Sequence, residues 1–201
     1  MKKVLLIASL FSFAFAGQAV VAGDAAAGKA KSAACAGCHG MDGNSPAPTF
    51  PKLAGQGEAY MVKQLQDFKS GKRTDATMNA MAAPLSDADM ADIAAFYASQ
   101  TGSTGTAAED QVELGQTIYR AGNAASGVAA CAACHGPTGV GNPQAKFPKL
   151  NGQHADYTAA QLNKFRKSER DNDAGSMMRG VAGKMTDAEI AAVSQYIQGL
   201  R

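Results

Sequence analysis

Apolar residues recur along this chain at the three- and four-residue spacing of an amphipathic helix. Before residue 100, Met90, Ile93 and Tyr97 share one such face, and Ser86 with Asp89 forms a capping box that starts the helix. No run of residues alternates between apolar and polar as a half-buried strand does. The pattern therefore predicts an all-α protein. A second capped helix of this kind is predicted by Thr186, Glu189, Ile190, Val193 and Ile197.

Other helices are expected earlier in each half. Asp24 can cap an Ala-rich helix that runs to the first Cys, and Leu65 with Phe68 has helical spacing, as do Leu162 and Phe165. Gly- and Pro-containing loops, such as residues 41–57, separate the helices. Long loops in a small domain indicate that something other than the chain fills its centre.

The order of these features repeats once. Residues 35–39 return 96 positions later as residues 131–135, and residues 50–53 return after 97 positions as residues 147–150. The capping pair returns at an offset of 100. We therefore predict a duplication with two tandem domains of one fold.

Four segments follow from the repeat and from composition. We expect a signal peptide at residues 1–22, a first domain at 23–100, a polar, Gly-containing linker at 101–110 and a second domain at 111–201. The second domain carries an insertion at residues 120–130.

The first residues have the layout of a secretory signal. Lys2 and Lys3 precede a mostly apolar run at residues 4–16, and small residues lead to a cleavage site after Ala22. The run is shorter than the roughly 20 residues of a membrane helix. We therefore expect the mature protein in the periplasm.

Charge and composition limit the classes of partner and indicate a thin hydrophobic core. Cleavage would remove two of 19 basic residues, which leaves 17 to balance 17 acidic ones. No strong basic field remains, which argues against nucleic acid as a partner. The chain has no Trp and many small residues, and a small domain with a thin core usually needs a cofactor or another staple.

The candidate chemistry lies in a Cys-x-x-Cys-His pattern that occurs once in each half. This pattern attaches c-type haem. Two thiols three positions apart add to the two vinyl groups of the porphyrin, and the adjoining His reaches the iron. The sequence predicts two covalently bound haem c groups, held by Cys35, Cys38 and His39 and by Cys131, Cys134 and His135.

Three other uses of these cysteines compete with haem. A Cys-four zinc site does not explain the His after each pair or the duplication around it. A thioredoxin-like pair needs a βαβ context, which the helical pattern lacks. A disulfide across two residues would be a poor staple for the fold, even in an oxidising compartment.

Each iron needs a sixth ligand, and Met is the usual partner of His in electron-carrying cytochromes c. The candidates are Met78 and Met81 in the first half and Met177 and Met178 in the second. Counting back from the last helix matches Met78 with Met178, whereas a later gap would match Met81 with Met178. His154 has no counterpart in the first half, and we interpret it as a loop or helix-start residue.

Groups around these ligands leave two questions open. The carbonyl of Pro51 or of Pro148 could accept a hydrogen bond from the axial His of its own domain, or the prolines could only shape the loop. The cationic residues at 63–73 and 164–170 could pair with haem propionates or lie on solvated helix faces.

The whole chain beyond residue 22 resembles the cytochrome c4 family of dihaem periplasmic cytochromes. The resemblance is carried by the two haem motifs and by residues 42–48, 50–56, 147–153 and 178–182. It implies two class I cytochrome c domains related by a pseudo-twofold axis. It also implies His/Met ligation, which falls here on His39, Met78, His135 and Met178.

The resemblance further implies a function. A monomer of this family, soluble or peripherally attached to the membrane, takes electrons from the quinol–cytochrome c reductase complex and passes them to a cbb3-type or other haem-copper oxidase. Irons with two protein ligands favour outer-sphere electron transfer over catalysis. The rival hypotheses are a dihaem peroxidase, a haem-based sensor and the electron-entry subunit of a dehydrogenase.

Overall fold

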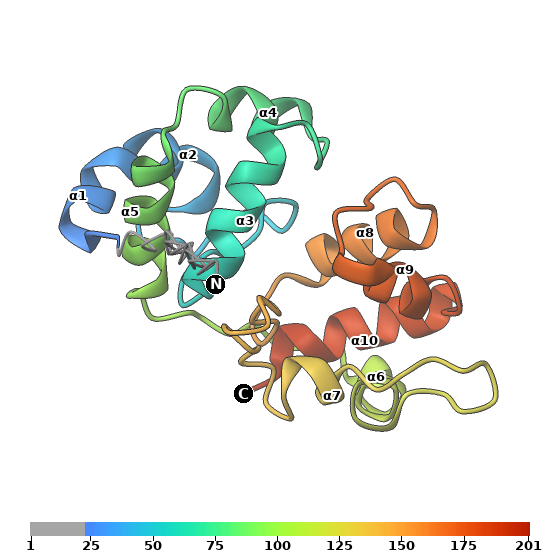
Figure 1. Ribbon diagram of the computed structural model, residues 1–201. Coiled ribbons are helices and arrows are strands. Elements are labelled where there is room, and N and C mark those ends of the chain that lie inside the picture. The colour runs from blue at the N-terminus through green and yellow to red at the C-terminus, as the bar shows by residue number, and fades with distance from the viewer. Residues whose placement is uncertain (1–22) are drawn as a thin grey trace, which may run out of the picture.

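The computed structural model describes residues 23–201, which form two helical domains joined by an extended segment (Figure 1). The predicted signal peptide, residues 1–22, lies outside the described residues. Those residues contain two isolated bridges and no β-strand, so the all-α prediction is confirmed. The first domain contains α1 (Ala25–Lys31), η1 (Ser32–Ala34), α2 (Ala36–His39), α3 (Glu58–Lys69), α4 (Ala76–Ala82) and α5 (Asp87–Ala98). The second contains α6 (Glu109–Ala121), α7 (Ala132–His135), α8 (Ala155–Arg166), η2 (Ala174–Ser176), α9 (Met177–Ala182) and α10 (Asp187–Gly199).

The helices of the two domains correspond in order and in packing. In the first domain α1 and α3 pack on α5, and in the second α6 and α8 pack on α10. The first and last helices of each domain cross at a glycine. A Cβ atom on Gly28 would lie 1.9 Å from the carbonyl oxygen of Asp92, and one on Gly115 would lie 2.3 Å from that of Ala192. Both crossings therefore depend on the absence of a side chain.

The last helix of each domain begins at the predicted capping box. The Ser86 side chain accepts from the Asp89 amide, and the Thr186 side chain accepts from the Glu189 amide. The faces predicted to be apolar are buried in two separate cores. The first core is centred on Met61, Ile93, Phe96 and Tyr97, and the second on Ile118, Tyr119, Ile190, Val193 and Ile197.

Two boundaries differ from the sequence prediction. The first helix does not run to Cys35 as one α-helix, because α1 ends at Lys31 and a 3-10 turn continues the chain. The predicted insertion at residues 120–130 is shorter, because α6 continues to Ala121 and ends at Gly122, whose φ is 70°. The remaining loop is closed by a bridge between Asn123 and Val128.

The extended segment between the domains is hydrogen-bonded to both of them. The Asn44 side chain of the first domain accepts from the Ser103 amide at 2.7 Å. On the other side, the Gln198 carbonyl accepts from the Gly105 amide at 3.0 Å, and the Gln198 side chain donates to the Thr106 carbonyl. These bonds fix both ends of the segment. Among residues 23–201, no helix has the length and apolar character needed to cross a bilayer.

Candidate metal centres

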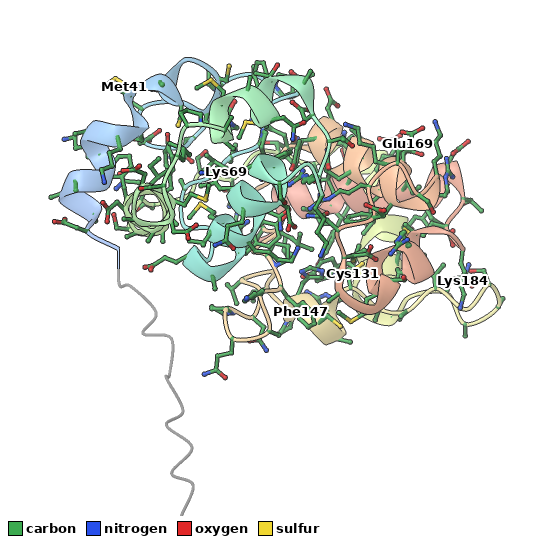
Figure 2. The ribbon with its side chains drawn as sticks, turned by 45° about the horizontal axis from the view of Figure 1, so that its top comes forward. Met41, Lys69, Cys131, Phe147, Glu169 and Lys184 are labelled. Atoms are coloured by element: carbon green, nitrogen blue, oxygen red, sulfur yellow. The ribbon has the colours of Figure 1, made fainter. Side chains whose placement is uncertain are left out.

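Each Cys-x-x-Cys-His motif forms a single helical turn. Cys35 precedes α2, and its carbonyl accepts a hydrogen bond from the His39 amide at 3.0 Å. Likewise, Cys131 precedes α7, and its carbonyl accepts from the His135 amide at 2.9 Å. The turn presents both thiols and the imidazole within one short segment. An aromatic ring lies beside each imidazole: the ring centres of Phe50 and His39 are 6.4 Å apart, and those of Phe147 and His135 are 6.2 Å apart. Cys131 and Phe147 of the second domain are labelled in Figure 2.

Both imidazoles are oriented by a proline carbonyl. The Nδ1 atom of His39 lies 2.9 Å from the carbonyl oxygen of Pro51, and Nδ1 of His135 lies 2.9 Å from that of Pro148. Because a carbonyl only accepts, Nδ1 carries the proton and Nε2 keeps its lone pair. Of the two readings that the sequence left open, the structure shows the hydrogen bond.

Burial favours the form of these imidazoles that binds a metal. His39 is 7% and His135 is 6% exposed. Burial lowers the pKa of each ring, and the hydrogen bond to the proline carbonyl opposes this in part. The two rings are therefore neutral near pH 7, with one nitrogen held and the other available as a ligand.

The cysteines do not fit the competing uses. Burial raises the pKa of the Cys131 thiol to about 11 and also raises that of Cys35, whereas a redox-active pair needs a lowered thiol pKa. None of the four cysteines is paired in a disulfide. From residue 23 onward, no three or more His, Cys, Asp or Glu side chains gather where they could hold a metal ion. The two pairs therefore do not form a joint zinc site.

An apolar cavity adjoins the first motif. Its walls include Cys35, Leu65, Leu85 and Ile93, and Met78 and Met81 also line it. A thiol, thioethers and aliphatic side chains make a suitable environment for a flat apolar macrocycle that is attached through the Cys and liganded by sulfur. This donor set fits haem c.

The offset between matching residues of the two domains changes from 97 to 100, and the structure locates the three additional residues of the second domain. Arg73 lies over the ring of Phe68 at 4.6 Å, and Arg170 lies over Phe165 at 4.5 Å, both pairs at an offset of 97. After these arginines the offset becomes 100, since Ala82 and Ala182 are both fully buried and both start the turn into the last helix. The additional three residues therefore lie after Arg170 and before Ala182.

This register matches Met78 with Met178. The helices α4 and α9 are unbroken up to Ala82 and Ala182, so a gap cannot be placed within their last turns. Met78 and Met178 are half-buried, whereas Met81 is 36% and Met177 is 45% exposed. In the register of the helices, Met81 corresponds to Val181, which has no sulfur.

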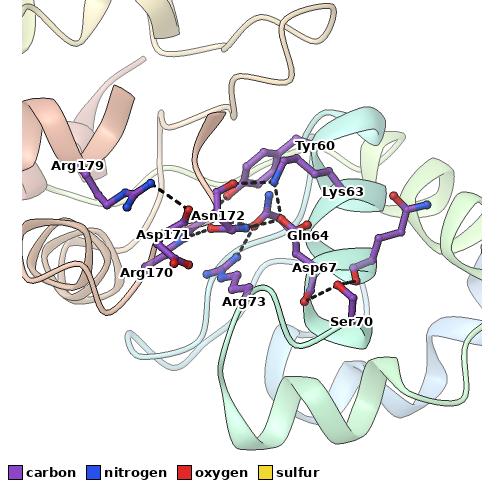
Figure 3. A network of polar contacts seen from close by, with 11 residues as sticks. Tyr60, Lys63, Gln64, Asp67, Ser70, Arg73, Arg170, Asp171, Asn172 and Arg179 are labelled. Atoms are coloured by element: carbon purple, nitrogen blue, oxygen red, sulfur yellow. Dashed lines mark hydrogen bonds and ion pairs between the residues drawn. The ribbon is translucent and has the colours of Figure 1, made fainter. Parts of the chain in front are cut away.

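Of the cationic residues at 63–73 and 164–170, Arg73 and Arg170 lie at the domain interface (Figure 3). Lys69, Lys72 and Lys167 are exposed. Arg73 donates to Gln64 of its own domain at 2.9 Å and to the Tyr157 hydroxyl of the other at 3.0 Å. The corresponding bonds of Arg170 reach Gln161 at 3.0 Å and the Tyr60 hydroxyl at 3.2 Å. In the described part of the chain, no hydrogen-bond partner of either guanidinium is a carboxylate.

One pair of contacts at this interface was not predicted from the sequence. The Gln56 side chain accepts from the Lys149 amide at 2.8 Å and donates to the Lys149 carbonyl at 3.0 Å. Gln153 makes the same two bonds to Lys52, both at 2.9 Å. The only signal in the sequence is that Gly-Gln returns at positions 152–153, and a repeat does not reveal which domain a side chain contacts.

His154 is confirmed as a helix-start residue. It is the N-cap of α8, and its Nε2 atom lies 2.8 Å from the Ser45 carbonyl of the first domain. The Ser45 hydroxyl in turn donates to the Cys38 carbonyl at 2.9 Å. His154 therefore joins the second domain to the loop that follows the first Cys-His turn.

Comparison with known proteins agrees with this geometry. The Cytochrome c family profile matches residues 25–101 and again 112–201. The chain is 52% identical to cytochrome c4 of Pseudomonas aeruginosa over 98% of both chains. The crystal structure of reduced cytochrome c4 from Pseudomonas stutzeri covers 90% of this chain and is itself covered completely, with 53% identity and a TM-score of 0.87. A thiosulfate dehydrogenase electron acceptor of Thiomonas intermedia is 37% identical over 98% of this chain and 90% of its own.

Proposed function

Because this chain belongs to the cytochrome c4 family, we propose that it takes electrons from a quinol–cytochrome c reductase and delivers them to a cbb3-type or other haem-copper oxidase in the periplasm. It is a dihaem electron carrier with two covalently bound haem c groups. We take the working protein to be a monomer that meets the membrane at most peripherally.

In the proposed arrangement, Cys35 and Cys38 hold the first haem, and its iron is liganded by His39 and Met78. The observation that carries this assignment is that each domain combines a His whose Nδ1–H is fixed by a proline carbonyl with a methionine in the matched register. The corresponding residues for the second haem are Cys131, Cys134, His135 and Met178.

The haem, when bound, supplies reversible one-electron redox chemistry. The imidazoles of His39 and His135 are buried, and with Met78 and Met178 they would supply two protein ligands to each iron. No position would then be left open for a substrate. This supports a carrier rather than a peroxidase or a gas sensor. Arg73 and Arg170, whose partners are uncharged, are suited to hold the propionate carboxylates at the interface (Figure 3).

Replacing the methionines one at a time tests the ligand assignment. We expect Met78→Ala and Met178→Ala each to remove the far-red band of Met–iron ligation from one haem and to let that haem bind carbon monoxide. Met81→Ala and Met177→Ala are the matched controls and should leave both haems as in the unmodified protein. Carbon monoxide binding in a control variant instead would overturn the assignment.

A second candidate donor comes from the relative that accepts electrons from thiosulfate dehydrogenase. Stopped-flow reduction by each donor, followed by oxidation with a purified haem-copper oxidase, separates the two. We expect fast reduction by the quinol–cytochrome c reductase complex. Fast reduction only by a thiosulfate dehydrogenase would assign the chain to sulfur oxidation.

A further inference from the structure

We propose that a hydrogen-bonded chain crosses the domain interface to each axial histidine, so that a glutamine of one domain tunes the haem of the other. This inference rests on the proposed His ligation of the two irons. It starts from the two glutamine contacts described above. Each glutamine bonds to the residue that directly follows the proline whose carbonyl orients a histidine.

The covalent structure of the peptide makes this connection direct. The amide of Lys52 and the carbonyl of Pro51 belong to the same peptide group. Gln153 Oε1 accepts from that amide at 2.9 Å, and the carbonyl accepts from Nδ1 of His39 at 2.9 Å. The chain therefore runs from Gln153 through one peptide group to the imidazole of the opposite domain.

The second chain has the same form in the opposite direction. Gln56 Oε1 accepts from the Lys149 amide at 2.8 Å, and the carbonyl of Pro148 in that peptide group accepts from His135. Both glutamines are buried, since Gln56 is 7% and Gln153 is 9% exposed. Each Oε1 also accepts from the backbone amide of the next residue, which is the N-cap of the following helix. The donor is Gly57 for Gln56, at 2.9 Å, and His154 for Gln153, at 3.0 Å.

The orientation of each glutamine amide is fixed by its partners. The Lys52 amide can only donate, so it must meet Oε1, and the Lys52 carbonyl can only accept, so it must meet Nε2. An acceptor on the amide of a peptide group polarises that group and makes its carbonyl a stronger acceptor. The imidazole behind it becomes more basic, which stabilises the ferric iron.

Two variants with opposite expected signs test this inference. In Gln153→Ala the Lys52 amide loses its acceptor, so the reduction potential of the first haem should rise and that of the second should stay unchanged. At a fixed applied potential, the ferrous-to-ferric ratio of the first haem should increase by up to about twofold, since polarisation changes the strength of a hydrogen bond by about 10–30%. In Gln153→Glu the carboxylate accepts more strongly from the Lys52 amide than the glutamine amide does, so the reduction potential of the first haem should fall. Gln56→Ala should raise the potential of the second haem alone.

The measurement is spectroelectrochemistry of the dihaem protein, with the two haems assigned through Met78→Ala and Met178→Ala. Asn44→Ala is the control, because it removes an uncharged contact to the linker and leaves both chains intact. Equal shifts of both haems, a shift in the glutamine's own domain, or the same sign for Gln153→Ala and Gln153→Glu would overturn the inference. A failure of the proposed ligation would appear instead in the unmodified protein, as a haem without the Met–iron band.

Discussion

The two domains keep the same contacts around their Cys-x-x-Cys-His turns and differ at three places outside them. The proline carbonyl, the interface glutamine and the arginine over a phenylalanine occur in both. By contrast, His154 stands where the first domain has Gly57, and the second domain has a loop after α6 and three more residues before α9. The shared contacts all lie between the proposed haem ligands and the interface. We infer that these are the parts of the repeat that the proposed haem sites require.

Removing one Cys pair should have the largest effect. We expect Cys35→Ser with Cys38→Ser to reduce the haem content from two to one per chain and to unfold the first domain, because its small core lacks another staple. The matched variant, Cys131→Ser with Cys134→Ser, should spare more of its domain, since the second core is larger. Haem-to-protein ratios and circular dichroism measure both outcomes. Equal loss of helix in the two variants would contradict the comparison of the cores.

Adding a methyl group at the glycine of either helix crossing should have the next largest effect on stability. Gly28→Ala and Gly115→Ala should each lower the free energy of unfolding by about 1–3 kcal/mol, because the new Cβ meets a backbone carbonyl that cannot move aside. The first domain should suffer more, since its contact is shorter by a few tenths of an ångström. Gly37→Ala is the control in denaturant titrations, since its Cβ would meet nothing within 4 Å and the second domain already has Ala133 there.

The capping acids of the two domains, Glu189 and Asp89, both have a lowered pKa, and different partners lower it. In the second domain, hydrogen bonds from Asn123 and from Thr186 lower the pKa of Glu189; in the first, Lys31 and Ser86 lower that of Asp89. A lowered folded-state pKa means that the ionised cap stabilises the fold above the unfolded value, which is 4.5 for Glu189. That contribution is lost as the pH falls from there through the folded pKa.

Glu189→Gln should therefore flatten the decline in stability of the second domain below about pH 4.5. Asn123→Ala should move the same decline to higher pH, because Glu189 loses its largest stabilising partner. Denaturant titrations at several pH values measure both. An unchanged slope in Glu189→Gln would assign the acid sensitivity to other groups.

Restoring the repeat at His154 should have the smallest effect. His154→Gly removes the contact with the Ser45 carbonyl and should cost about 0.5–1.5 kcal/mol of unfolding free energy. Gly57→Ala in the first domain is the control, since nothing lies within 4 Å of its added Cβ. A cost well above that range, or loss of a haem band, would show that His154 does more than join the domains.

Much of the fold was predictable because its signals depend on residues that are close together in the sequence. The capping boxes at Ser86 and Thr186 and the spacing of Met90, Ile93 and Tyr97 depend on neighbours within one or two turns. The Cys-x-x-Cys-His motif is equally local. The insertion at residues 120–130 was predicted to begin too early, because nothing before Gly122 breaks helix α6 and only that residue's positive φ ends it.

The contacts between domains could not be predicted in this way. Gln56 and Lys149 are 93 residues apart, and an amide side chain has many potential partners in a sequence. In the sequence, Arg73 and Arg170 look like residues of a solvated helix face. Each is buried only because the opposite domain packs against it. The extended segment between the domains also depends on Asn44 and Gln198, which lie far from it in sequence.

The most direct test of the carrier function is the visible spectrum of the purified protein in the ferric and ferrous states, together with its haem-to-protein ratio. We predict two c-type haems per chain, both low-spin in both states and both with the far-red band of Met-to-ferric-iron ligation. High-spin features, or the absence of that band from one haem in the unmodified protein, would mean an open or differently liganded iron and would contradict the account.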